Sequence, residues 1–199
     1  MVKGFYNDLR RAKEAEKIAY EVFNRLTLNL LFEDVSDERQ YYHKGDLKIW
    51  DIFNPSKECL FMDVKDDSVI HRTKNLFAEE SVFYKENNSL QNGFMKNSTY
   101  DYIAYMSKSE KKIYLLDFKK WQECYKMGIY KEMFHKYQNS YGYLMKLNQA
   151  IELGVVLATI NYEETNGAYY PISVIMNDNI IINEAYYLFS TMNNYSKSA

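Results

Sequence analysis

The chain has 199 residues, of which 47% are hydrophobic and 26% charged, and its formal net charge is −2. This composition is typical of a folded globular protein and excludes a disordered chain or a fibrous repeat. No apolar run approaches the roughly 20 residues that a membrane-spanning helix needs, and the N-terminal residues are charged rather than apolar. We therefore expect a cytoplasmic protein with no membrane partner, folded as one domain over residues 1–199.

The first predicted element is a helix. Apolar residues recur at steps of three and four from Phe5 to Leu26, and this spacing is typical of an amphipathic helix. Residues 28–32 can begin an extended segment. The acidic cluster over residues 33–38 favours a loop or a sheet edge.

A β-hairpin is predicted next. Residues 47–53 alternate imperfectly and end at Asn54-Pro55-Ser56, which is a turn signal because Pro fixes φ and Asn and Ser bond to their own backbone. Residues 59–65 follow this turn directly. We expect the two runs to pair, with the second as a central strand.

The rest of the chain continues to alternate between strand and helix patterns. The predicted elements are a helix or strand over 76–84, a hairpin of 100–106 and 112–117, a helix over 118–137, a buried strand over 154–160 and a hairpin over 172–182. This pattern predicts an α/β fold with a central mixed β-sheet flanked by helices. We expect the core to span about residues 5–160, with a C-terminal extension over 161–199.

One acidic residue stands within the apolar stripe of the first helix. At about 100° per residue, Glu16 projects between Ala12, Ala19 and Phe23. A carboxylate buried there is costly unless a cation or a hydrogen-bond donor meets it. The alternative is that Glu16 lies at the edge of the helix beside a basic neighbour.

A carboxylate and an amine share one face of the central strand. Because side chains alternate along a strand, Asp63 and Lys65 point the same way. Together they could hold a divalent metal and orient an attacking water. Asp46, which follows Gly45 across the hairpin, is the best candidate for a second oxygen ligand. The alternative is an exposed ion pair at the end of a strand, which contributes little to stability.

The acid-x-lysine spacing is not specific by itself. It occurs four times, as Asp46-Leu47-Lys48, Asp63-Val64-Lys65, Glu110-Lys111-Lys112 and Asp117-Phe118-Lys119. The last of these is a serious rival, because it follows an apolar strand and has Asp101 upstream. The Asp63 triplet is the one that comes next after the acid in the helix stripe and the Gly45-Asp46 pair, in the order that the active site needs.

Taken in chain order, these residues resemble the PD-(D/E)XK nuclease superfamily, in particular its small members from phages and mobile elements. The resemblance rests on Asp8-Leu9-x-x-Ala12-x-x-x-Glu16, Gly45-Asp46, Asp63-Val64-Lys65 and Asn75-Leu76-Phe77-Ala78-Glu79. It covers about residues 5–160. The sequence departs from the family pattern at Gly45, where a proline is the signature, at Asp63, where Glu is more frequent, and at Ala12, where Gly is usual.

The resemblance implies a restriction-endonuclease-like core and a Mg²⁺-dependent deoxyribonuclease activity. It implies that Asp46, Asp63 and the carbonyl of Val64 ligate Mg²⁺ or Mn²⁺, and that Lys65 is the catalytic lysine. Glu16 is implied as a metal ligand or as an acid beside the metal. Glu79 is a possible further site residue, although an exposed face of residues 76–84 explains it equally well.

The densest basic stretch follows residue 107, where nine basic and four acidic residues lie between positions 108 and 146. These lysines could neutralise backbone phosphates of DNA, or they could form a solvated helix face. The candidate substrate-binding residues in this stretch are Lys108, Lys111, Lys112, Lys119 and Lys120.

Two other functional classes stay open. The near-neutral net charge and the acidic segment over 147–199 suit a protein partner or a homodimer as well as a DNA duplex. The chain could therefore be a catalytically silent protein of nuclease fold that acts as a nucleic-acid-binding, protein-binding or inhibitory module. An unrelated α/β domain would place Glu16, Asp46 and Asp63 in separate environments.

Overall fold

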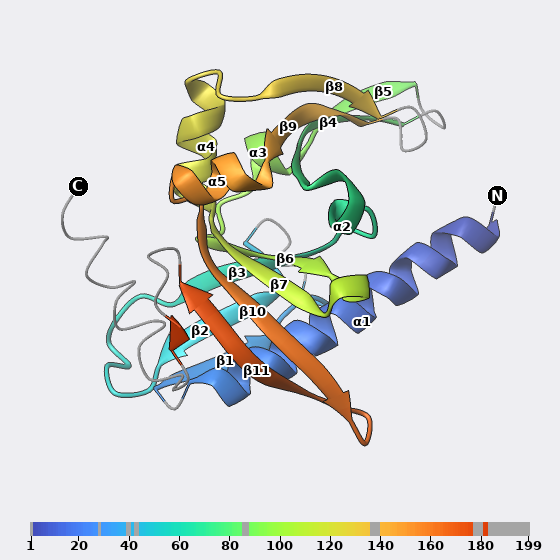
Figure 1. Ribbon diagram of the computed structural model, residues 1–199. Coiled ribbons are helices and arrows are strands. Elements are labelled where there is room, and N and C mark those ends of the chain that lie inside the picture. Colours follow the sequence, from blue (N-terminus) through green and yellow to red (C-terminus); the bar gives the residue numbers. More distant parts are fainter. Residues whose placement is uncertain are drawn as a thin grey trace.

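A computed structural model of the chain describes residues 2–27, 29–38, 41, 44–84, 88–135, 140–176 and 181–182. Among these residues the strands form two sheets, which Figure 1 shows one above the other. None of the described helices has the length and hydropathy needed to span a membrane.

The larger sheet has the strand order β1-β2-β3-β6-β7-β10-β11-β12 within the described residues. Its strands are β1 (Leu30–Asp34), β2 (Leu47–Asp51), β3 (Leu60–Asp66), β6 (Tyr102–Ser107), β7 (Lys112–Asp117), β10 (Val156–Thr165), β11 (Ala168–Met176) and β12 (Ile181–Ile182). The pair β3 and β6 is parallel, and the other neighbouring pairs are antiparallel. The sheet is therefore mixed, as the sequence predicts.

The smaller sheet has the order β5-β4-β9-β8 and is antiparallel. Its strands are β4 (Asn75–Tyr84), β5 (Ser89–Asn92), β8 (Lys131–His135) and β9 (Ser140–Lys146). The described helices are α1 (Val2–Leu26), α2 (Ile70–Thr73), α3 (Phe94–Asn97), the 3₁₀ turn η2 (Lys108–Glu110), α4 (Phe118–Lys126) and α5 (Leu147–Glu152). Half of the smaller sheet thus lies in the connection between the parallel strands β3 and β6.

The two faces of the larger sheet contribute to two hydrophobic cores. On one face, α1 buries Val22 and Phe23 against Leu47 and Met62. On the other face, the sheet packs against α4, α5 and the smaller sheet. Alternation along β3 sends Phe61 to this second face, so Asp63 and Lys65 point toward the side where the smaller sheet lies.

The sequence predicts the first half of the fold closely. The helix over residues 5–26 is confirmed as α1, and the predicted hairpin is confirmed as β2 and β3. The acidic residues 33 and 34 belong to the edge strand β1 rather than to a loop, because β1 pairs with β2. Residues 76–84 form strand β4, which resolves the open choice between helix and strand.

Later elements follow the prediction in part. The hairpin of β6 and β7 is confirmed, and β11 pairs with β12 as the predicted hairpin over 172–182 requires. The predicted helix over 118–137 is wrong beyond residue 126. Gly128 adopts φ +74, and the amide of Ile129 donates to the carbonyl of Cys124, so the helix ends in a left-handed cap and β8 follows. Residues 183–199 of the expected C-terminal extension lie outside the described residues.

Candidate functional site

Asp46 lies at the point where β2 stops pairing with β3. The ladder ends at Leu47 opposite Met62, and the amide of Asp46 still donates to the carbonyl of Met62 over 2.9 Å. One residue earlier, Gly45 has φ +119, and a Cβ atom there would lie 2.6 Å from that same carbonyl oxygen. Only glycine fits this approach. The resulting turn lets Oδ2 of Asp46 accept a 2.8 Å hydrogen bond from the amide of Val64.

The Asp63 and Lys65 side chains meet on the face of β3 that looks toward the smaller sheet. The Lys65 Nζ atom is 2.7 Å from Oδ2 of Asp63. Asp63 is only 8% exposed, whereas the Lys65 side chain retains 36% of its exposure. The hydrogen bond to Val64 holds Asp46 beside this pair. Three of the residues singled out in the sequence therefore lie together.

The electrostatics of this group are those of crowded carboxylates. Burial raises the pKa of Asp46, and the carboxylates of Asp63 and Glu16 raise it further; Lys65 and the Val64 amide oppose this, and the result is about 7. For Lys65, burial lowers the pKa, but the nearby carboxylates, first that of Asp63, more than compensate and hold it above its usual value. Lys65 is thus an ammonium at neutral pH.

Glu16 is buried on α1, as its place in the apolar stripe predicts, at 9% exposure. Its partner is the basic neighbour Lys13, whose Nζ lies 3.0 Å from Oε2 of Glu16. Lys13 also bonds to Ser36 and Asp37 beyond the end of β1. Glu16 contributes to the raised pKa of Asp46, so its carboxylate lies within electrostatic reach of the site.

Glu79 reaches the site from the smaller sheet. It lies on β4 and accepts a 2.9 Å hydrogen bond from the hydroxyl of Ser140 on β9. Burial raises its pKa, and the Lys65 ammonium opposes that rise. Tyr100 is buried nearby, and its pKa is raised by burial and by the carboxylates of Asp63, Asp46 and Glu79. The second sheet thus contributes the Glu79 carboxylate to the surroundings of the site.

The rival triplet has a different environment. Oδ1 of Asp117 accepts from the amide of Lys120 and caps α4. Oδ2 of Asp101 accepts from the amide of Phe61, and its Oδ1 pairs with Lys119 at 3.0 Å. These acids are already used in holding β3, β7 and α4 together, so we do not assign them to a metal site.

The structure does not bring the predicted substrate-binding lysines together. Lys108, Lys111 and Lys112 lie at the turn between β6 and β7, whereas Lys119 and Lys120 lie at the opposite end of β7, roughly 20 Å away for a six-residue strand. They form neither one helix face nor one basic surface. The strand between the two groups is the one predicted over residues 112–117, and its length separates them.

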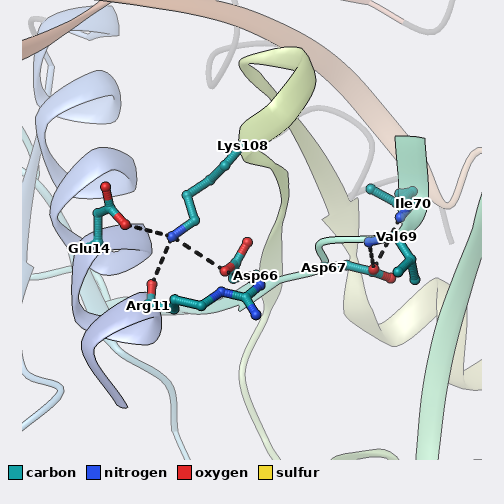
Figure 2. A network of polar contacts seen from close by, with 7 residues as sticks. All are labelled: Arg11, Glu14, Asp66, Asp67, Val69, Ile70 and Lys108. Atoms are coloured by element: carbon teal, nitrogen blue, oxygen red, sulfur yellow. Dashed lines mark hydrogen bonds and ion pairs between the residues drawn. The ribbon is translucent and has the colours of Figure 1, made fainter. Parts of the chain in front are cut away.

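Lys108 is engaged within the protein. Figure 2 shows its ammonium between α1 and the end of β3, where it contacts Oε2 of Glu14, the backbone carbonyl of Arg11 and Oδ2 of Asp66. The Arg11 guanidinium meets the same Asp66 carboxylate at 2.9 Å. This network fastens the β6–β7 turn to α1, and Lys108 is therefore a structural residue rather than an open phosphate contact.

From the sequence, no binding role is assigned to the two lysines that flank Asp46. Lys48 lies two residues after Asp46 on β2, with its Nζ 4.0 Å from the centre of the Trp50 ring and 3.2 Å from the hydroxyl of Tyr41. Lys44 lies two residues before Asp46, over the ring of Phe61. Both flank the Gly45-Asp46 pair in the sequence, and that position was the signal that could have identified them.

The site holds carboxylate oxygens, which are the donor type that a hard divalent cation prefers. Oδ2 of Asp63 and Oε2 of Glu16 are buried and contact lysine ammonium groups without accepting a well-formed hydrogen bond. The pKa of Asp46 is raised first by burial and then by the neighbouring carboxylates, and a bound cation would favour the ionised form of that carboxylate. Mg²⁺ takes one or two carboxylates and completes its shell with other oxygens. Within the described part of the chain, no three His, Cys, Asp or Glu side chains could hold an ion by themselves.

Comparison with known proteins adds no assignment to this geometry. No family model, curated protein or solved structure matches the chain. Any function proposed for the chain must therefore be inferred from the chemistry of the site.

Proposed function

We propose that this protein is a metal-dependent phosphodiesterase of PD-(D/E)XK type that hydrolyses the DNA backbone in the cytoplasm. The observation that carries the proposal is the hydrogen bond from the Val64 amide to Asp46, which holds a second carboxylate beside the Asp63–Lys65 pair. The mixed sheet, in which the antiparallel strands β1, β2 and β3 lead into the parallel neighbour β6, is compatible with a restriction-endonuclease-like core.

In this proposal Asp46 and Asp63 would hold Mg²⁺ or Mn²⁺, with the Val64 carbonyl as a further oxygen ligand. The bound ion would lower the pKa of a water molecule and polarise the phosphate. Lys65 orients the attacking water and balances the negative charge that develops on the phosphate oxygens. The water oxygen would become bonded to phosphorus and lose a proton to solvent, one phosphate ester bond would break, and the departing sugar oxygen would take up a proton from solvent.

The remaining charged residues act around this centre. Glu16 adds negative potential at Asp46 and so strengthens attraction for the cation. Lys44 and Lys48 flank Asp46 in the sequence and would contact the phosphates beside the bond that breaks. The acidic surroundings of the site would disfavour DNA until the metal is bound.

Nicking of supercoiled plasmid tests the proposal. We expect wild-type protein to nick in Mg²⁺ or Mn²⁺ and to stop on addition of EDTA, and we expect Lys65→Ala to lower the rate by on the order of 100-fold or more. The matched control is Lys126→Ala, which removes an exposed lysine at the end of α4. It should nick as wild type does.

Two results would overturn this assignment. Equal nicking by Lys65→Ala and wild type would remove Lys65 from the reaction. Absence of metal-dependent nicking, together with absence of Mn²⁺ binding in calorimetry, would favour the catalytically silent alternative, in which the same fold serves as a nucleic-acid-binding, protein-binding or inhibitory module.

A further inference from the structure

The ammonium group of Lys65 has an aromatic neighbour as well as an acidic one. Oδ2 of Asp63 lies 2.7 Å from Nζ, and the centre of the Phe94 ring lies 5.1 Å from the same atom. An ammonium over the face of an aromatic ring within about 6 Å is attracted by the ring quadrupole. The acid comes from the same strand as the lysine, whereas Phe94 comes from α3 in the connection between β3 and β6.

The backbone before Phe94 is fixed against β4. Gly93 is buried, and its amide donates to the carbonyl of Glu80 over 2.6 Å. A Cβ atom at Gly93 would lie 2.5 Å from the carbonyl oxygen of Glu79, so only glycine allows this approach. The start of α3 is therefore held against the strand that carries Glu79.

The Phe94 ring is also fixed by packing. Its centre lies 6.3 Å from that of Phe118 and 6.0 Å from that of Trp121, both of which are fully buried on α4. These contacts support the ring from the side of the second core. The ring therefore presents a stationary surface to Lys65.

We propose that Phe94 is the positioning residue of Lys65: it holds the ammonium against Asp63 and limits its contact with water. A lysine side chain has four flexible carbons and many accessible rotamers, so an acid on one side does not fix it. The ring adds a second, directional contact. The catalytic consequence of this inference rests on the proposed function, but the position of the ammonium does not.

Nuclear magnetic resonance tests the position directly, on the metal-free full chain labelled at lysine. Protons held over a ring face are shifted upfield, so we expect the Cε protons of Lys65 to resonate upfield of those of the other lysines. The signal is assigned by its loss in Lys65→Ala. Phe94→Leu should return it to the ordinary lysine position, and Phe94→Tyr, which restores a ring, should keep it upfield.

Kinetics test the consequence. Because Phe94 acts through Lys65, Phe94→Leu should lower kcat for plasmid nicking by about 3- to 30-fold, as the range of cation–π energies implies, with KM unchanged. Phe94→Tyr should restore most of kcat. The control is Phe83→Leu, the same substitution at a half-buried position of β4, which should leave both constants as in wild type.

The outcomes separate the two proposals. An ordinary lysine shift in wild type, or an unchanged kcat in a folded Phe94→Leu variant of an active enzyme, overturns the role of Phe94 and leaves the nuclease proposal standing. A protein that shows the upfield signal and its loss in Phe94→Leu, but never nicks, retains the Phe94–Lys65 contact and loses the nuclease proposal. If Phe94→Leu fails to fold, the wild-type shift and the Phe94→Tyr kinetics still decide.

Discussion

Two Asp-x-Lys triplets of this protein share a spacing and differ in what surrounds them. At the junction of β7 and α4, Asp117 caps the helix and Lys119 pairs with Asp101, which in turn holds the amide of Phe61. On β3, Oδ2 of Asp63 is buried without a well-formed hydrogen bond and contacts an ammonium. The acid of the first triplet accepts a backbone hydrogen bond that caps a helix, whereas one oxygen of the second acid is buried without a well-formed hydrogen bond.

The comparison teaches that a motif of this kind is identified by the state of its oxygen atoms. A carboxylate that accepts hydrogen bonds from the backbone stabilises the structure and is less available to a ligand. A buried carboxylate with an unsatisfied oxygen is destabilising by itself, and it is retained most readily where a ligand satisfies it. The other triplet therefore serves as an internal control for the predictions that follow.

The largest expected effect separates the two triplets by activity. Asp63→Asn removes one charged oxygen from the proposed metal site and should lower plasmid nicking by on the order of 100-fold or more. Asp117→Ala should leave the nicking rate as in wild type. It should instead lose about 1 kcal/mol of stability through the missing helix cap, or about 2–4 °C in Tm.

Nicking rates and thermal unfolding, measured for both variants, check that Asp63→Asn loses activity and Asp117→Ala loses stability. If Asp117→Ala loses activity at a temperature where it is folded, the Asp117 triplet takes part in the reaction, and our assignment to the Asp63 triplet alone is wrong. Retention of activity in Asp63→Asn would contradict the metal site.

A second prediction uses the raised pKa of Asp46. Because this pKa is about 7 in the folded protein and about 4 in an unfolded chain, the folded state binds the extra proton between these values. Stability in EDTA should therefore fall as the pH rises from about 4 to about 7 and then level off. Asp46→Asn should lack this fall and should unfold several degrees above wild type at pH 8.

Divalent metal should reverse the order of the two unfolding temperatures, so that wild type unfolds above Asp46→Asn at pH 8. Mg²⁺ or Mn²⁺ binds the ionised carboxylates, so it should raise the Tm of wild type at pH 8 and leave that of Asp46→Asn nearly unchanged. Thermal unfolding at several pH values, with EDTA and with metal, measures both effects. If the Tm of wild type in EDTA does not fall between pH 5 and 7 relative to that of Asp46→Asn, the raised pKa of Asp46 would be contradicted.

The parts of the fold that the sequence predicts are those set by local patterns. The period of α1 and the Asn54-Pro55-Ser56 turn between β2 and β3 are local signals, and both elements form where expected. The smaller sheet depends on pairing β4 with β9, which lies about sixty residues further along the chain, and local spacing carries no such information. The overlong helix is different, because Gly128 is a local stop signal that the helical spacing masked.

The candidate site divides in the same way. Alternation along β3 predicts that Asp63 and Lys65 share a face. The hydrogen bond between Asp46 and Val64 depends on the register of the hairpin and on the backbone angle of Gly45, and neither follows from residue types. The basic stretch is a different case, because the predicted strand over residues 112–117 already separates positions 108 and 119, which lie toward opposite ends of β7.

The smallest expected effect tests which lysines meet the substrate. Lys48 lies on β2 two residues after Asp46, so Lys48→Ala should reduce the salt dependence of DNA binding by about one ion in the slope of log K against log salt. Binding is measured to a short oligonucleotide with Ca²⁺ in place of Mg²⁺, so that cleavage does not intervene. Lys126→Ala, on the exposed end of α4, should leave the slope as in wild type. Because Lys48 also stacks on Trp50, Lys48→Gln is the second variant: it keeps most of the side chain's contact with the ring and removes only the charge. An unchanged slope in both Lys48 variants would show that the phosphates approach Asp46 from another side of the sheet.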